Sequence, residues 1–225
     1  HIKDVGSYAI SGLAVTFPLM NISTALGTLV GVGASTILSM LLGQRNYQAA
    51  NKVIINEVML NVIIGTLYTV ITLVFLDPIL MFFGASANTL PYARDYMVII
   101  LIGNVITHLY FGLINIIRAS GNPKLAMALT IFTVVSNTIL DPIFIFWLDM
   151  GIKGAALATV ICQLLALVYT VRYFLSGKNY LRLPRRMSEY RLDWRIAKDS
   201  LTVGMGPFLM NSAACIVTMF INQQL

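Results

Sequence analysis

The residues best suited to chemistry lie in one long apolar segment, LAMALTIFTVVSNTILDPIFIFWL, at residues 125–148. This segment contains Asp141, with Asn137 four positions before it and Pro142 directly after it. Residues four apart share a face of a helix, so the amide and the carboxylate should project together. A carboxylate within a membrane helix is costly unless it has partners, and it therefore favours a functional role.

The chemistry that these groups favour is the binding of a small cation or a proton. Pro142 has no N–H, so the carbonyl of Thr138 loses its usual helical partner. Carboxylate, amide and carbonyl oxygens suit Na⁺, as they suit other hard cations. They also suit a proton, because burial disfavours the charged form of a carboxylate. The alternative is that Asp141 only hydrates a helix end. However, PIFIFWLD follows it, which puts Asp141 about 10 Å below Asp149 at about 1.5 Å per residue.

Other polar residues in apolar segments carry weaker signals. Asn104 and His108 lie four apart, and Gln163 lies in a later segment, so these three are candidates for lining a cavity. Glu57 is close to the start of an apolar segment and is expected at the membrane interface. Asp77 precedes Pro78 at a helix end, where a structural role is expected.

An enzyme is disfavoured. The sequence has no nucleophile elbow, phosphate-binding loop or metal-ligand spacing, and it has only two histidines. Cys162 and Cys215 both fall inside apolar segments, so we expect small membrane-buried side chains with no disulfide or metal cluster. We expect no cofactor other than Na⁺ or H⁺ as a coupling ion.

The elements that must position these residues are membrane helices. Apolar residues make up 58% of the chain and charged ones only 11%, whereas soluble domains carry about 25% charged residues. The mean hydropathy is +0.81. Apolar segments of the length that crosses about 30 Å of hydrocarbon recur along the chain. They predict an all-α polytopic membrane helix bundle with about six transmembrane helices, at about 14–42, 54–76, 96–117, 125–148, 154–175 and 199–225.

The basic residues predict the orientation. Twelve of the fifteen Lys and Arg residues fall in alternate connections, eight of them between Arg172 and Lys198. This asymmetry is typical of cytoplasmic connections, so membrane lipid is the expected partner and nucleic acid is not. Asp193 is expected to cap a helix that begins at Trp194. Pro207, in the sequence GMGP, predicts a bend or hinge in the last helix, as Pro142 does in its own.

Several motifs together resemble those of bacterial MATE-type multidrug and toxin extrusion transporters. They are GVGASTILSMLLGQRNYQAAN (31–51), RASGNPKLAM (118–127), SNTILDPIFIF (136–146) and GIKGAALATVICQ (151–163). The resemblance implies a twelve-helix fold of two six-helix bundles. Residues 1–175 would then be most of the N-terminal bundle without its first helix, residues 176–198 a basic cytoplasmic linker, and residues 199–225 the first helix of the C-terminal bundle.

The resemblance also implies a function. Such proteins export organic cations and amphipathic drugs from the bacterial cytoplasmic (inner) membrane, driven by Na⁺ or H⁺. Asn137 and Asp141 match the acidic coupling site of the family, and Thr159 matches its threonine on the following helix. Helices of the same protein outside this chain would be partners. Two alternatives stay open: a lipid-linked glycan flippase of the same superfamily, which the lack of Lys and Arg in the membrane-embedded parts disfavours, and a non-transporting membrane scaffold, which would leave Asp141 and Asn137 unexplained.

Overall fold

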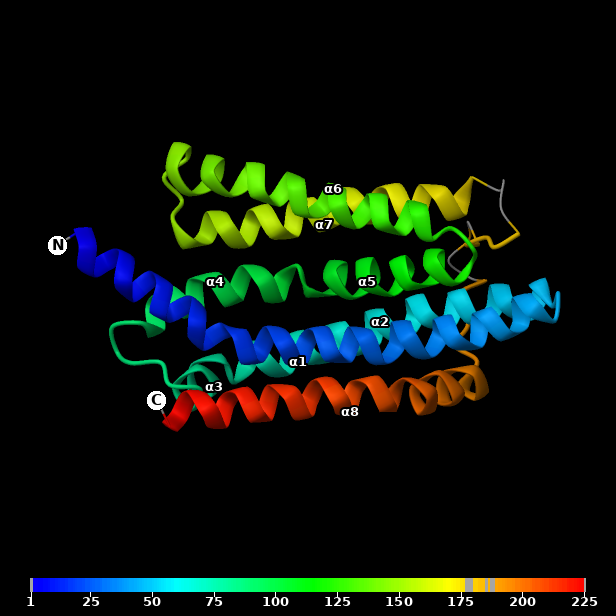
Figure 1. The fold of residues 1–225 in the computed structure, drawn as a ribbon, viewed down its shortest axis with the longest axis horizontal. Helices are drawn as coiled ribbons and strands as arrows, with labels where there is room; N and C mark the ends of the chain where they lie inside the picture. Colours follow the sequence, from blue (N-terminus) through cyan, green and yellow to red (C-terminus); the bar gives the residue numbers. More distant parts are fainter. Residues whose placement is uncertain (1, 177–179, 185, 187–188, 225) are drawn as a thin grey trace.

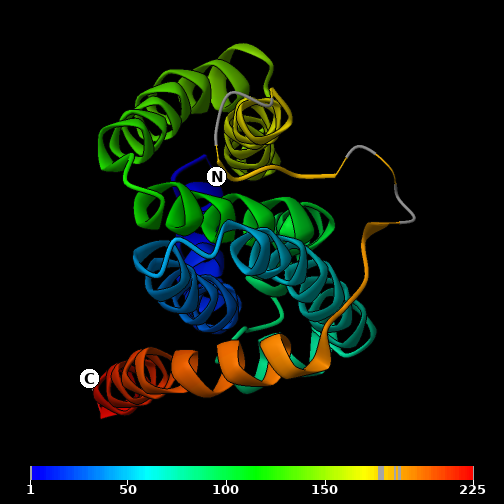
Figure 2. The same ribbon diagram turned by 90° about the vertical axis from the view of Figure 1, so that its right-hand side faces the viewer.

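The chain folds into stacked layers of long, roughly parallel or antiparallel helices. The computed structural model describes residues 2–176, 180–184, 186 and 189–224. Figures 1 and 2 show α6 and α7 in one layer, α4 and α5 in the next, α1 and α2 beyond them, and α8 on the far side. The elements are α1 (Ile2–Gly43), α2 (Tyr47–Val74), α3 (Leu76–Phe82), α4 (Leu90–Ile102), α5 (Asn104–Ala119), α6 (Pro123–Pro142), the π-helix η1 (Ile143–Trp147), α7 (Ile152–Leu175) and α8 (Trp194–Gln224).

The helices confirm the prediction of an all-α membrane bundle. Four helical segments in the described part of the chain are long and apolar enough to cross a membrane: Ile10–Gly43, Tyr47–Val74, Pro123–Trp147 and Ile152–Leu175. The predicted span at 96–117 is bent in the structure, because α4 and α5, which together are long and apolar enough to cross a membrane, meet at an angle of 54°. Gly103 lies between them, and a Cβ there would overlap the side chain of Val160 on α7. Residues 199–224 of the sixth predicted span lie within α8, a 31-residue helix.

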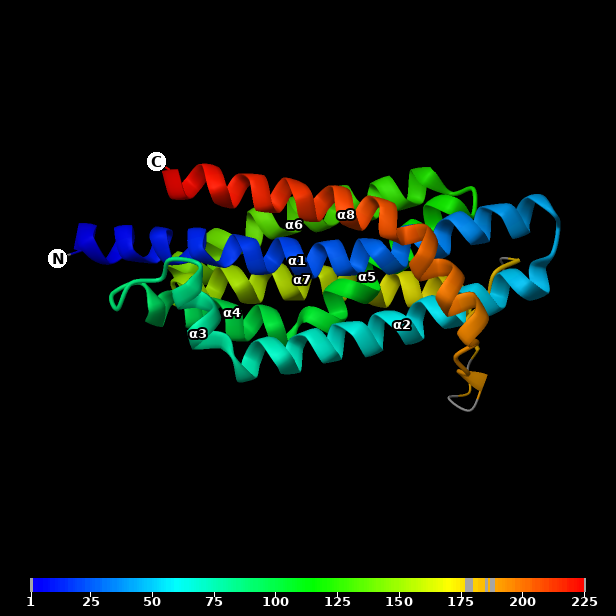
Figure 3. The same cartoon turned by 90° about the horizontal axis from the view of Figure 1, so that it is seen from below.

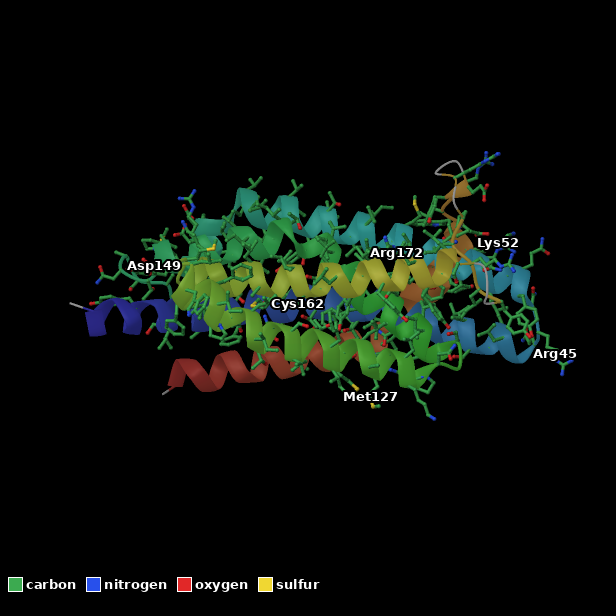
Figure 4. The ribbon with its side chains drawn as sticks, turned by 90° about the horizontal axis from the view of Figure 1, so that it is seen from above. Arg45, Lys52, Met127, Asp149, Cys162 and Arg172 are labelled. Atoms are coloured by element: carbon green, nitrogen blue, oxygen red, sulfur yellow. The ribbon has the colours of Figure 1, made fainter. Side chains whose placement is uncertain are left out.

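Basic and acidic connections lie at opposite ends of the bundle. Figure 4 shows Arg45, Lys52 and Arg172 near one end and Asp149 near the other. At the Asp149 end, Asp77 lies in the first turn of α3 and pairs with Arg94 at 3.5 Å. This exposed ion pair agrees with the structural role expected for Asp77. We call the two ends the basic end and the acidic end.

Two apolar clusters hold the layers together. At the basic end, Leu38, Ile54 and Ile116 belong to a core shared by α1, α2 and α5, with Phe174 of α7 beside them. At the acidic end, Leu80, Met97 and Leu101 belong to a second cluster, with further residues from α1 and α7. The polar residues described below lie along the same helices.

Glycines of α1 allow close approach on two faces. A Cβ at Gly31 would lie 3.2 Å from the Cα of Gly112, so this face packs directly on α5. On another face, a Cβ at Gly33 would overlap the carbonyl of Ser200, and a Cβ at Gly204 would overlap the carbonyl of Leu29. Small residues at such points let helix backbones touch. Figure 3 shows α8 crossing α1 along this face.

The connection before α8 is tied to the basic end of α2. The Asn51 side-chain Oδ1 accepts a hydrogen bond from the backbone N–H of Arg182 at 2.7 Å, and Asn56 Oδ1 accepts one from that of Asp193 at 2.8 Å. Asp193 Oδ1 in turn accepts from the backbone N–H of Arg195 at 3.1 Å. The predicted cap is therefore confirmed, since α8 begins at Trp194.

Candidate functional site

The structure brings three of the predicted site residues together between α6 and α7. The Asn137 side-chain Nδ2 donates to Asp141 Oδ1 at 3.1 Å along α6. The same nitrogen donates to Thr159 Oγ1 at 3.3 Å, across to α7. The Thr159 hydroxyl donates to the Ala155 carbonyl at 3.0 Å. Asn137 thus joins the carboxylate of one helix to the hydroxyl of the next, and we call these three residues the α6–α7 site.

Local backbone structure positions Asp141. Pro142, which follows it, is the last residue of α6, and the chain continues into η1 without leaving the helical path. The wider winding begins where proline removes a donor from the α-helical ladder. η1 packs tightly on the start of α7, because a Cβ at Gly154 would lie 2.7 Å from the Phe144 carbonyl oxygen. The proline therefore changes the winding directly beside the carboxylate.

The α6–α7 site is open on one side. Asp141, Asn137 and Thr159 are each only partly buried, and most of α6 is exposed. The two ion pairs that the described residues form, Arg94 with Asp77 and Lys153 with Asp95, leave Asp141 out. Its carboxylate keeps Asn137 as its hydrogen-bond donor within the described part of the chain. Such a group can accept a proton or a small cation from the open side.

Thr138 does not join the cluster through its side chain. That side chain is exposed, and its hydroxyl donates to the Val134 carbonyl at 2.9 Å. Its backbone carbonyl still lacks the usual donor, because the residue four positions on is Pro142. The role predicted for the Thr138 carbonyl stays a prediction.

Asn104 and His108 lie in a separate polar cluster inside the bundle. Both are buried, and Ser23 of α1 contacts both: its Oγ donates to Asn104 Oδ1 and lies 3.1 Å from His108 Nε2. Asn104 Nδ2 also donates to the Gly65 carbonyl and the Thr69 hydroxyl of α2, each at 3.2 Å. These partners tie α1, α2 and α5 together. A cavity-lining role for the two residues stays a prediction.

Gln163 and Pro207 complete the predicted set. Gln163 is buried on α7, and its Oε1 accepts a hydrogen bond from the Thr107 hydroxyl of α5. It lies one turn from Thr159 but has a different partner.

Pro207 lies within α8, which continues through it to Gln224. Cys162 is buried as expected, whereas the side chain of Cys215 lies outside the described residues.

Sequence reasoning missed a second acid–amide pair, formed by Glu57 and Asn61 of α2. Glu57 was expected at the membrane interface, but its side chain is 0% exposed, as is that of Asn61. Asn61 Nδ2 donates to Glu57 Oε1. The signal that could have found the pair is its spacing of four residues, the same as that of Asn137 and Asp141.

Comparisons with known proteins agree with this architecture. The family model described as MatE matches residues 2–143. The multidrug export protein MepA of Staphylococcus haemolyticus (strain JCSC1435) is 34% identical over 204 residues, which cover 91% of this chain and 45% of that protein. MepA of Staphylococcus aureus (strain MSSA476) is 30% identical over 205 residues, with the same coverage. The chain thus spans about half the length of these relatives.

Solved structures show the same arrangement of helices. A multidrug resistance MATE family transporter of the MOP superfamily in an inward-facing conformation has a TM-score of 0.89 and 25% identity, over 96% of this chain and 49% of that one. An outward-facing conformation of such a transporter has a TM-score of 0.87 and 26% identity, over 95% and 47%. The prediction that the chain makes up about half of a larger helical transporter fold is confirmed.

The family model covers more than half of the chain, and MepA covers nine-tenths of it. The apolar helices and the bacterial relatives identify a multi-pass protein of the cytoplasmic membrane. The chain belongs to the MATE family of multidrug transporters.

Proposed function

We propose that the protein carrying this chain is an antiporter that exports organic cations and amphipathic drugs in exchange for Na⁺ or H⁺. The observation that carries the proposal is the α6–α7 site, where Asn137 links Asp141 to Thr159 across two apolar helices. A carboxylate at such a depth requires neutralisation, and a coupling ion supplies it. The names of the relatives, which are multidrug export proteins, support the choice of drugs as cargo.

The proposed role of each residue follows from its contacts. Asp141 takes up the proton or the Na⁺, because its carboxylate is the charged group of the site. Asn137 holds that carboxylate in place, and the Thr159 hydroxyl adds a further oxygen within the same cluster. Occupation removes or balances the negative charge next to Pro142, where α-helical winding gives way to η1. We propose that this local change biases the protein between states open to the two sides of the membrane.

The similarity to both solved conformations supports a concerted movement. The same segment of this chain matches the inward-facing and outward-facing transporters with TM-scores of 0.89 and 0.87. A segment that fits both conformations nearly equally well suits rigid-body rearrangement of bundles. Membrane lipid and the rest of the same protein would then surround α6, whose apolar side chains are largely exposed.

The test is efflux of ethidium or norfloxacin from membrane vesicles that contain the whole protein, under separate pH and Na⁺ gradients. Asp141→Asn should abolish gradient-driven efflux while the protein still inserts into the membrane. Asp149→Asn is the matched control, since this residue lies in the outer connection beyond η1. Drug efflux by Asp141→Asn with unchanged ion dependence would contradict the proposal.

The same vesicles separate the alternatives. A lipid-linked glycan flippase would move fluorescent lipid rather than ethidium, and a scaffold would move neither. Charge again disfavours the flippase, because binding a pyrophosphate calls for cations. The four described segments that are long enough to cross a membrane carry their basic residues toward their ends: Lys52, Lys124, Lys153 and Arg172.

A further inference from the structure

The interior of the α1–α2–α5 core contains a carboxylate that the coupling mechanism does not use. Glu57 and Asn61 lie one turn apart on α2, and both side chains are 0% exposed. Asn61 Nδ2 donates to Glu57 Oε1 and, at 3.1 Å, to the backbone carbonyl of Glu57. The second carboxyl oxygen, Oε2, and the amide oxygen of Asn61 are both buried without a hydrogen-bond partner.

The backbone of α5 packs directly against the pair. A Cβ at Gly112 of α5 would overlap Glu57 Oε1 and would lie 2.5 Å from Asn61 Nδ2, so the glycine backbone lies directly against both side chains. On the other side of Gly112, Gly31 brings α1 into contact. The backbones of α1 and α5 thus meet at Gly112, the residue that lies against the pair.

No countercharge reaches the carboxyl group. The Ile10–Gly43 part of α1 contains no titratable residue. In the described part of the chain, no hydrogen bond or ion pair joins Glu57 to a charged or titratable side chain. Among the side chains that the structure describes, such groups on the helices that pack against α2, and on α2 itself, are Tyr8 of α1, Asp77 of α3, Tyr92, Arg94, Asp95 and Tyr96 of α4, His108, Tyr110 and Arg118 of α5, Arg195, Lys198 and Asp199 of α8, and Tyr47, Lys52 and Tyr68 of α2.

One proton would satisfy both unpartnered atoms. A carboxylate only accepts hydrogen bonds, whereas a carboxylic acid also donates one. A proton on Oε2 supplies a donor, and Asn61 Oδ1 is an acceptor without a donor. An ionised carboxylate would instead be buried without an opposite charge beside it, and one of its oxygens would lack a hydrogen bond. Proteins avoid burying a charge in this way. We propose that Glu57 carries a proton and forms with Asn61 a neutral acid–amide pair, a second proton site that is separate from the α6–α7 site.

This proposal goes beyond drug export and does not depend on it. Because both side chains are 0% exposed and Gly112 lies against them, we expect the proton to exchange with water when α2 and α5 move apart. The exchange of this proton therefore depends on how tightly α2 and α5 pack at Gly112.

Infrared difference spectroscopy of the whole protein in lipid vesicles at neutral pH tests the proposal without drug or ion gradient. A protonated carboxylic acid has a C=O stretching band that a carboxylate lacks. We expect Glu57→Gln, which keeps the shape and a donor toward Asn61, to lose one such band completely. Asp141→Asn is the control and should leave that band in place, whatever its effect on efflux.

The wild-type protein and a second variant keep the test decisive if Glu57→Gln does not fold. Asn61→Leu should shift the same band to higher frequency, because the acid loses both of its amide hydrogen bonds. In the wild type, the band should persist when the external medium is made mildly alkaline. A loss of carboxylate bands in Glu57→Gln would overturn the proposal by showing that Glu57 is ionised. A wild-type spectrum in Asn61→Leu would overturn it by showing that the acid band does not depend on Asn61.

Discussion

The two acid–amide pairs of this chain, Asn137–Asp141 on α6 and Glu57–Asn61 on α2, have the same spacing but very different surroundings. Within this chain, which spans about half the length of its relatives, the pair on α6 is partly exposed, because α6 packs mainly on α5 and α7. The pair on α2 is fully buried, because α1 and α5 enclose it. An exposed pair can exchange a ligand, whereas the groups of a buried pair must find their hydrogen-bond partners inside the protein. Neighbouring helices therefore decide what the same residue pattern does.

The largest expected effect comes from filling the space beside the buried pair. Gly112→Ala places a Cβ where Glu57 Oε1 and Asn61 Nδ2 lie, so we expect destabilisation by about 1–3 kcal/mol from overpacking. Thermal unfolding of the purified protein measures this loss. Gly43→Ala is the control, because a Cβ there meets nothing within 4 Å. Equal unfolding temperatures for the two variants would show that the α2–α5 contact is loose.

The next effect comes from removing the amide of each pair in turn. Asn61→Ala leaves the buried carboxyl group without its donor, which costs about 1–3 kcal/mol. Asn137→Ala acts at a partly exposed site and should cost less than about 1 kcal/mol in stability while weakening coupled efflux. Denaturant or heat unfolding of both variants gives the comparison directly. If Asn137→Ala were the more destabilising change, the contrast between exposed and buried pairs would fail.

A smaller effect is expected from the hydroxyl that extends the exposed pair. Thr159→Val keeps the volume but removes the acceptor of the Asn137 hydrogen bond, worth about 0.5–1.5 kcal/mol. We expect a two- to tenfold higher ion concentration for half-maximal efflux. Thr138→Val is the matched control, since its hydroxyl bonds only its own helix. A wild-type ion dependence of Thr159→Val would remove this threonine from the site.

The smallest effect should come from charges that lie outside both pairs. Lys153 and Asp95 form an ion pair at 3.1 Å, and both side chains are about half exposed. Lys153→Gln should change stability by less than about 1 kcal/mol, because solvent and salt screen exposed pairs. Unfolding at low and high salt measures the change. A large loss of stability that does not depend on salt would mean that this ion pair is more buried than the exposure of its side chains indicates.

The sequence was sufficient to predict the features that depend on local patterns. Asp141 stands out because it interrupts a long apolar segment, and the spacing to Asn137 places the two on one face. The resemblance to transporters added Thr159, and the structure places it within hydrogen-bonding distance. The cap at Asp193 followed from residue type and position alone.

The features that could not be predicted depend on where helices begin and on distant contacts. The apolar segment at 54–76 put Glu57 near a helix end, but α2 begins at Tyr47 after the Asn46 cap. Glu57 therefore lies about 15 Å along the helix, at about 1.5 Å per residue. Likewise, the bend at Gly103 depends on the Val160 side chain of α7, which no local pattern near α4 reveals.

The crossing of α1 and α8 limits how the two helices can move. Their backbones touch because Gly33 faces Ser200 and Gly204 faces Leu29, with no side chain between them. Sliding α8 along its axis would replace Gly204 with a bulkier neighbour and force the helices apart. Swivelling about the contact keeps the glycines in register. The crossing therefore permits rotation of α8 about the contact but opposes sliding. Asn51 and Asn56 of α2, which hydrogen-bond the preceding connection, hold the start of α8 close to this contact.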